Sequence, residues 1–78
     1  MFEVATDLKI TQPTITAVSN TFISIENYLS ILSFNNDSIE IKTKGKNIRI
    51  NGSKLSLKYI EDNEIGIKGI INYIEYFD

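Results

Sequence analysis

Between Thr21 and Ile67 the chain alternates apolar and polar residues in short runs, and each run ends near Asn, Asp or Gly. A period of two places successive side chains on opposite faces of a β-strand. Turn-forming residues at these intervals divide the alternation into hairpins. The sequence therefore predicts antiparallel strands that share one apolar face and one polar face.

The clearest hairpin is predicted around a turn at residues 44–45. It pairs Ile41 with Ile48 and Ile39 with Ile50, because a tight turn fixes the register of the two strands that it joins. The apolar side chains of both strands then lie on a common face.

A two-residue turn at 36–37 extends this face to the preceding strand. In that register Phe34 and Leu32 lie opposite Ile39 and Ile41. The prediction therefore places both Phe34 and Leu32 in the core.

Earlier in the chain, Pro13 cannot donate a hydrogen bond to a sheet, so residues 14–18 are predicted to form an edge strand. A turn at 19–20 follows. Residues 21–26 and 30–35 are rich in Ile, Phe and Ser and are separated by a short loop. They predict a further hairpin.

Three signals concern the later strands. The Asn-Gly pair at 51–52 predicts a type I′ turn. A three-residue loop at 61–63, with its Asn in a left-handed conformation, pairs Tyr59 with Ile65 and keeps both on the apolar face. Gly69 interrupts the last strand and predicts a bulge or bend.

Leaving the apolar face in water would cost roughly 25 cal/mol per Å². No segment has an apolar period of 3.6 residues that predicts a covering helix, so the sheet must close on itself or pair with another copy. We predict an all-β fold: a single small domain, an antiparallel β-meander of about six or seven short strands, curled into a partly closed barrel or a folded-over sandwich. The predicted apolar face consists of Ile23, Ile25, Leu32, Phe34, Ile39, Ile41, Ile48, Ile50, Leu55, Leu57, Tyr59, Ile65 and Ile67.

The chain has 78 residues, enough for one domain. Residues 1–12 lack a clear period and are predicted to form a loosely held N-terminal arm, and residues 13–78 to form the β domain. The chain contains no Cys and no His, which excludes disulfides, Cys/His zinc sites and an imidazole base. We expect no cofactor, no metal and no enzymatic activity.

The formal net charge of −2 argues against a nucleic-acid binder, which needs clustered Lys and Arg. The apolar runs are far shorter than the roughly 20 residues that span a bilayer, and the N-terminus lacks the pattern of a signal peptide. We expect a cytoplasmic protein with no nucleic-acid partner and no direct membrane insertion.

Three groups of polar residues are candidate sites. The acidic residues Glu61, Asp62 and Glu64 lack the spacing of a calcium loop and favour a solvated turn. Glu26 and Asn27 form a polar turn, which is either a recognition point or a cap for backbone groups. The basic residues could meet phosphates, but a solubilising surface is favoured because no aromatic residue accompanies them on the polar face; they are Lys42, Lys44, Lys46, Arg49, Lys54 and Lys58.

The C-terminal run places apolar side chains on both sides of one strand, more than a single sheet face can bury. It is the predicted interface, with the residues Ile70, Ile71, Tyr73, Ile74, Tyr76 and Phe77.

Four stretches carry a resemblance to a known family: Pro13-x-Ile15-Thr16, Asn20-x-x-Ile23-x-Ile25-Glu26-Asn27, Ile31-Leu32-Ser33-Phe34, and Glu64-Ile65-x-Ile67-x-Gly69-x-Ile71-x-x-Ile74-x-Tyr76. In these the chain resembles the YabP/YqfC family of sporulation proteins, over roughly residues 13–78. The resemblance implies a small non-enzymatic factor of endospore formation in a Firmicute, acting in forespore envelope or spore coat assembly. It also implies self-association into a homo-oligomer or a sporulation membrane protein as partner, with a location at the forespore membrane or coat.

The alternative is a small β-barrel module that binds single-stranded nucleic acid or a peptide. That reading predicts that Lys42, Arg49 and Lys58 line one groove together with exposed aromatic residues. The assembly reading instead predicts exposed apolar residues within 70–77.

Overall fold

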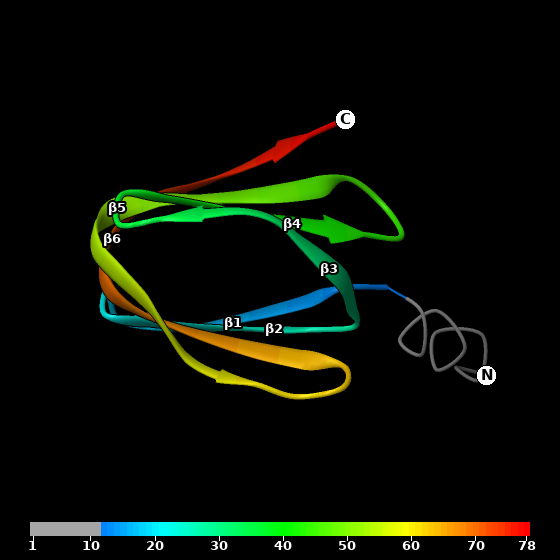
Figure 1. Ribbon diagram of the computed structural model, residues 1–78, viewed down its shortest axis with the longest axis horizontal. Coiled ribbons are helices and arrows are strands. Elements are labelled where there is room, and N and C mark those ends of the chain that lie inside the picture. Colours follow the sequence, from blue (N-terminus) through cyan, green and yellow to red (C-terminus); the bar gives the residue numbers. More distant parts are fainter. Residues whose placement is uncertain (1–11) are drawn as a thin grey trace, which may run out of the picture.

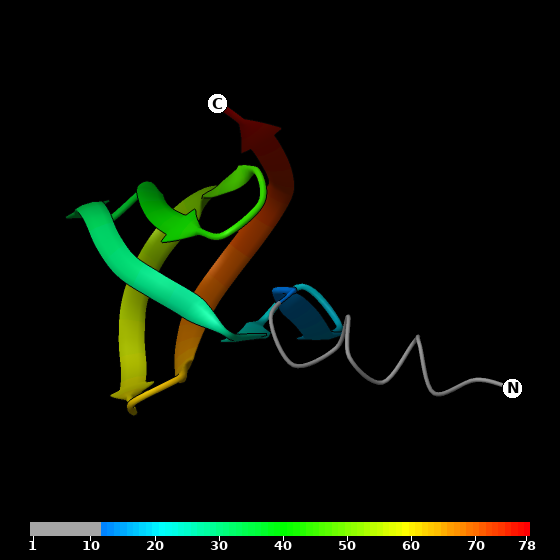
Figure 2. The same cartoon turned by 90° about the vertical axis from the view of Figure 1, so that its right-hand side faces the viewer.

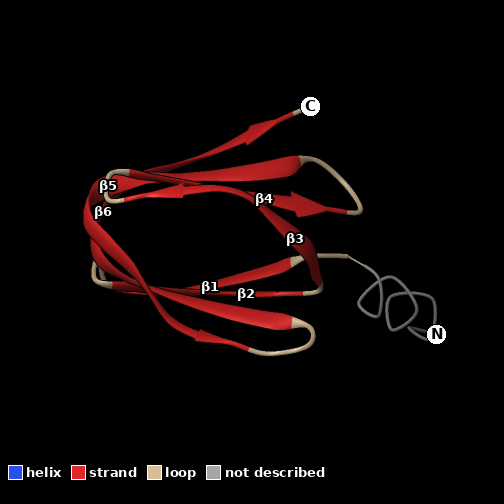
Figure 3. Cartoon of the chain, viewed as in Figure 1, coloured by secondary structure: helices blue, strands red, loops and turns tan. Residues whose placement is uncertain are grey.

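The structure, a computed structural model, describes residues 12–78. One antiparallel sheet contains all six strands, in the order β1-β2-β6-β5-β4-β3, and the described residues form no helix (Figures 1 and 3). This confirms the predicted all-β fold and its single small domain. The predicted N-terminal arm lies almost entirely outside the described residues. The strands are β1 (Thr14–Val18), β2 (Phe22–Glu26), β3 (Tyr28–Asn35), β4 (Ser38–Thr43), β5 (Asn47–Ile60) and β6 (Glu64–Phe77).

The sheet folds over into two layers because β5 and β6, of 14 residues each, bend and pass through both (Figure 1). We call upper layer the set of β3, β4, residues 47–53 of β5 and residues 70–77 of β6. The lower layer contains β1, β2 and the remaining halves of β5 and β6. The sheet order has two ends, so the sheet is not closed into a barrel.

The core lies between the layers and is built mostly from Ile. Fully burying one Ile side chain stabilises the fold by roughly 1.5–3 kcal/mol, so these residues dominate its stability. Ten apolar residues of the described part of the chain are buried, and nine of them belong to the predicted apolar face, which confirms that consecutive hairpins share a face. They are Ile23, Ile25, Ile39, Ile41, Ile48, Ile50, Leu55, Ile65 and Ile67, and Ile71 is the tenth.

The register predicted for the turn at 44–45 is confirmed, because Ile39 pairs with Ile50 and Ile41 with Ile48. The turn at 36–37 is confirmed by the pair of Asn35 with Ser38. The predicted position of Leu32 is wrong. A bulge shifts the register of β3, so that Ile31 pairs with Ile41 and Leu32 is left 46% exposed.

Phe34 pairs with Ile39 as predicted, but it is not buried. Its strand, β3, is the last of the sheet, so a neighbour covers it on one side only. Phe34 therefore stays 43% exposed. Leu57 is half-buried and packs against the core.

The predicted hairpin between 21–26 and 30–35 is also wrong, because β2 pairs with β1 and β6 instead of β3. Asn27 takes a left-handed conformation (φ 64°) between β2 and β3, and its backbone N–H donates to the backbone carbonyl oxygen of Asn63. The chain thereby leaves the lower layer and enters the upper one. The edge strand 14–18 and the turn at 19–20 are confirmed.

The turn predicted at 51–52 is absent, and β5 continues through both residues. Gly52 is needed there for a close approach, since a Cβ atom would overlap the carbonyl oxygen of Ile70 on β6. Its amide donates to the carbonyl oxygen of Asp37 at 3.1 Å, which holds the β3–β4 turn against β5.

The loop at 61–63 has its predicted length, but its Asn is not left-handed. Tyr59 pairs with Gly66 instead of Ile65, because an irregularity between Leu57 and Tyr59 moves the register. Tyr59 therefore lies over Gly66 on the outer face. The predicted bend at Gly69 is confirmed by its φ of 143° and by a register shift in the β5–β6 pair beside it.

Candidate interaction surface

The C-terminal half of β6 forms a free sheet edge. In the lower layer β6 lies between β2 and β5, but β2 pairs only as far as Lys68. Beyond that point, residues 70–77 pair with β5 and with no other described strand. The backbone N–H of Ile71 still donates to the carbonyl oxygen of Asn20 at 2.7 Å, so the part of the edge that is open to another strand consists of residues 72–77. In such an edge every second residue directs its backbone N–H and C=O away from the sheet, where another strand can bind them.

Three of the predicted interface residues are exposed at this edge: Ile70 by 43%, Tyr73 by 56% and Tyr76 by 63%. Tyr76 pairs with Ile48 and so lies on the inner face, while Tyr73 pairs with Asn51 on the outer face. Exposed apolar side chains thus flank the free backbone on both faces. Burying them needs a further strand or chain.

The other three predicted interface residues have partners inside the domain. Ile71 is buried in the core, and Ile74 is half-buried and packs against it. Phe77 is half-buried beneath the guanidinium of Arg49, whose Cζ lies 4.4 Å from the ring centroid. Any interface on β6 therefore uses Ile70, Tyr73 and Tyr76.

The sequence reasoning missed a second apolar edge on β3. Among the described strands it pairs only with β4, it has no charged residue, and it exposes Leu29, Leu32 and Phe34. Exposed edges usually include charged residues or Pro, which discourage pairing with another chain. Eight consecutive residues without a charge were the available signal, but alternation had assigned Leu32 and Phe34 to the core.

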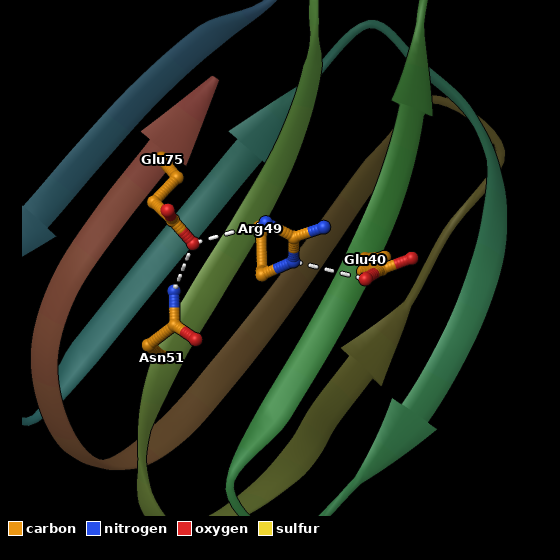
Figure 4. A network of polar contacts seen from close by, with 4 residues as sticks. All are labelled: Glu40, Arg49, Asn51 and Glu75. Carbon is orange, nitrogen blue, oxygen red and sulfur yellow. Dashed lines mark hydrogen bonds and ion pairs between the residues drawn. The ribbon is translucent and has the colours of Figure 1, made fainter. Parts of the chain in front are cut away.

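Arg49 joins three strands on the outer face of the upper layer (Figure 4). Its Nε donates to Oε2 of Glu40 on β4 at 2.9 Å, and its Nη1 donates to Oε1 of Glu75 on β6 at 3.0 Å. Nδ2 of Asn51 donates to the same Glu75 oxygen at 3.0 Å. This network holds the C-terminal half of β6 against β5.

The network also fixes the charges of its members. Hydrogen bonds to Glu40 and then Glu75 raise the pKa of Arg49 above its ordinary value. Hydrogen bonds from Arg49 and then Asn51 lower the pKa of Glu75. Both groups are therefore charged at neutral pH, which suits a structural ion pair rather than proton transfer.

The outer face of the lower layer contains an aromatic pair, Phe22 and Tyr59, with ring centroids 6.3 Å apart. Nζ of Lys58 lies 5.2 Å from the Phe22 centroid. Tyr59 donates its hydroxyl to Glu64, and this hydrogen bond together with desolvation raises the pKa of Tyr59 to about 12. The expectation that no aromatic accompanies the basic residues is wrong for Lys58, and also for Arg49 with its Phe77 contact.

The three basic residues of the alternative reading do not share one surface. Lys42 and Arg49 lie in the upper layer and Lys58 in the lower layer. Arg49 already binds two carboxylates, and Lys58 lies over Phe22. The geometry therefore does not gather these residues into a single basic groove.

At the polar turn, the side chain of Asn27 forms a hydrogen bond with the backbone. Its Nδ2 donates to the carbonyl oxygen of Gln12 at 2.9 Å. Glu26 is exposed at the end of β2. Within residues 12–78, no three acidic side chains are placed to share a metal ion. The same residues include no helix of the length and hydropathy needed to cross a membrane.

Two comparisons with known proteins bear on identity. No curated protein matches the sequence. The YabP family matches residues 9–78, which include all six strands and both free edges of the upper layer. The chain therefore belongs to the YabP family, which indicates a sporulation-related protein.

Proposed function

We propose that the protein is a non-enzymatic assembly factor of the forespore envelope or spore coat, which associates with copies of itself and with a sporulation membrane protein. The observation that carries this proposal is the free edge at residues 72–77, with Tyr73 and Tyr76 exposed on it and Ile70 exposed beside it. Free strand edges with flanking side chains bind other strands through their backbone.

The titrating groups support a non-enzymatic role. A catalytic acid or base works best with a pKa near the operating pH. The pKa values of three groups move away from that range: the pKa of Glu75 is lowered, the pKa of Tyr59 is raised to about 12, and the pKa of Arg49 is raised above its ordinary value. The chain also has no His and no Cys.

The test compares self-association of the wild type with that of Tyr76→Asp, using sedimentation velocity over a wide range of concentration. Val18→Asp is the matched control, since Val18 is 58% exposed on β1 in the lower layer. We expect the mass of wild type and control to rise with concentration and that of Tyr76→Asp to stay at one chain. A wild type that remains a monomer throughout would refute self-association.

A titration with single-stranded oligonucleotides at several salt concentrations tests the alternative function. Tight binding that weakens steeply with salt would favour the nucleic-acid reading. A fluorescent fusion in sporulating cells then tests the location. We expect a signal at the forespore boundary, and a uniform cytoplasmic signal would contradict the envelope or coat role.

A further inference from the structure

We propose that copies of the chain associate head to tail, with β3 of one copy pairing antiparallel with residues 73–77 of β6 in the next copy. This inference rests on the self-association in the proposed function and specifies its geometry. The product is a continuous sheet that can grow at both ends.

The two edges terminate the same layer. Across the upper layer the strands follow the order β6-β5-β4-β3, so β3 and the C-terminal half of β6 lie on opposite sides of it (Figure 2). Each edge exposes three apolar side chains: Leu29, Leu32 and Phe34 on β3, and Ile70, Tyr73 and Tyr76 on β6. A second copy placed beside the first thus brings two unlike apolar edges together.

The strand directions suit this arrangement. The pairs β3–β4, β4–β5 and β5–β6 are all antiparallel, so β3 and β6 run in opposite directions. A copy shifted sideways along the sheet therefore places β3 antiparallel to β6 of its neighbour, with both inner faces on the same side. No reversal of either copy is needed.

The residues match along this continuation. One row of the inner face reads Ile31, Ile41, Ile48, Tyr76, and another reads Phe34, Ile39, Ile50, Ile74. Extending the rows without a shift sets Ile31 beside Tyr76 of the next copy, and Phe34 beside Ile74. The 43% exposed Phe34 and the 63% exposed Tyr76 thereby gain apolar neighbours.

The outer face matches as well. Ser33, Glu40, Arg49 and Glu75 form one row. Its extension sets Glu75 of the next copy beside Ser33, on a strand that has no charge. Glu75 is already paired with Arg49 in its own copy, so no like charge opposes it and no charge becomes unpaired.

A two-fold pair of β6 strands matches less well. Antiparallel self-pairing centred on Glu75 sets two carboxylates opposite each other. Centring on Ile74 sets Tyr73 opposite Glu75, and centring on Tyr76 sets Ile74 opposite Asp78. Each of these registers sets an apolar residue opposite a charged one or sets two like charges opposite each other. The head-to-tail pair does neither. Unlike edges that join without closing produce open chains.

A complementation experiment with two full-length variants tests the proposal. Phe34→Lys blocks the β3 edge and leaves β6 intact, and Tyr76→Lys does the reverse. Sedimentation velocity is measured for wild type, each variant and their equimolar mixture, with Val18→Lys as control. Circular dichroism checks that every variant folds; Leu32→Lys and Tyr73→Lys, at 46% and 56% exposed sites, replace either one that does not.

We expect the wild type and the control to exceed the mass of a dimer as concentration rises. Each variant alone should stay at one chain, and the mixture should reach two chains and stop, because only one intact β3–β6 pair can form. If Phe34→Lys or Tyr76→Lys dimerises alone, the interface is two-fold and the head-to-tail geometry is wrong. If both variants still form large assemblies, the interface lies elsewhere. A monomeric wild type refutes the proposed self-association itself.

Discussion

Arg49 donates from Nη1 to Oε1 of Glu75 across the β5–β6 pair, at a distance of 3.0 Å. The same oxygen accepts a hydrogen bond from Asn51. Glu75 belongs to the stretch of β6 that β2 does not pair with. These side-chain bonds therefore add to the backbone hydrogen bonds that join this stretch of β6 to β5. The free edge that can meet another chain is thus held from one side.

Glu75→Gln should lower stability at neutral pH and have little effect in acid. The lowered pKa of Glu75 means that its ionised form stabilises the fold above the unfolded value, about 4.3, and that this contribution is lost as the pH falls through the folded value. Thermal unfolding of both proteins at pH 7 and at about pH 3 measures the difference. An equal difference at both pH values would show that the carboxylate charge is not involved.

Tyr59 should titrate at about pH 12, which is above its ordinary value of 10.0. Since the pKa is raised, the stabilisation from the neutral hydroxyl is complete below the unfolded pKa and is lost as the pH rises through the folded one. The ultraviolet absorbance of tyrosinate, compared between wild type and Tyr59→Phe, isolates this group. Glu64→Gln should move its midpoint towards 10.0, and an unchanged midpoint would rule out Glu64 as the main cause.

Gly69→Ala should destabilise the domain by about 1–3 kcal/mol, because a side chain is strained at a φ of 143°. The new Cβ would also lie 2.6 Å from the carbonyl oxygen of Lys54. Gly45→Ala is the control, since among residues 12–78 its Cβ would meet only Gln12 Oε1, at 3.7 Å. Denaturant unfolding measures both variants, and equal losses would contradict the bend at Gly69.

Ile41→Ala should cost about 2–5 kcal/mol, because Ile41 is fully buried and its truncation leaves a cavity. Leu32→Ala should cost less than about 1 kcal/mol, since Leu32 lies at a bulge and is 46% exposed. Denaturant unfolding at low protein concentration keeps self-association out of the comparison. A large loss for Leu32→Ala would mean that β3 follows simple alternation after all.

Local patterning was sufficient for the hairpins closed by short turns. The turn at 36–37 sets the pair Phe34–Ile39, and the turn at 44–45 sets the pairs Ile39–Ile50 and Ile41–Ile48, because turn length alone fixes register there. Alternation also identified most of the core. Pairings that depend on distant segments were not accessible in this way. The β2–β6 pair joins Ile23 to Ile67, and no local signal distinguishes that partner from the adjacent β3.

The sequence prediction was also wrong where a glycine can have two roles, in a tight turn or at a close contact between strands. The Asn-Gly pair at 51–52 has the chemistry of a turn, but Gly52 is there because Ile70 passes too close for a side chain. For the interaction surface, the apolar run at 70–77 was visible in the sequence. The sequence predicted a bulge or bend in this strand near Gly69. Which side chains turn outward depends on where the bulge falls, and the pairing places one between Ile71 and Tyr73.

Amide hydrogen exchange at low and high protein concentration tests the central claim most directly, namely that the two free edges of the upper layer bind other copies of the chain. The account predicts that amides within 28–35 and 73–77 become more protected as concentration rises. Amides within 64–68, which already lie between β2 and β5, should not change. Exchange at both edges that is independent of concentration, in a protein folded throughout, would contradict the account.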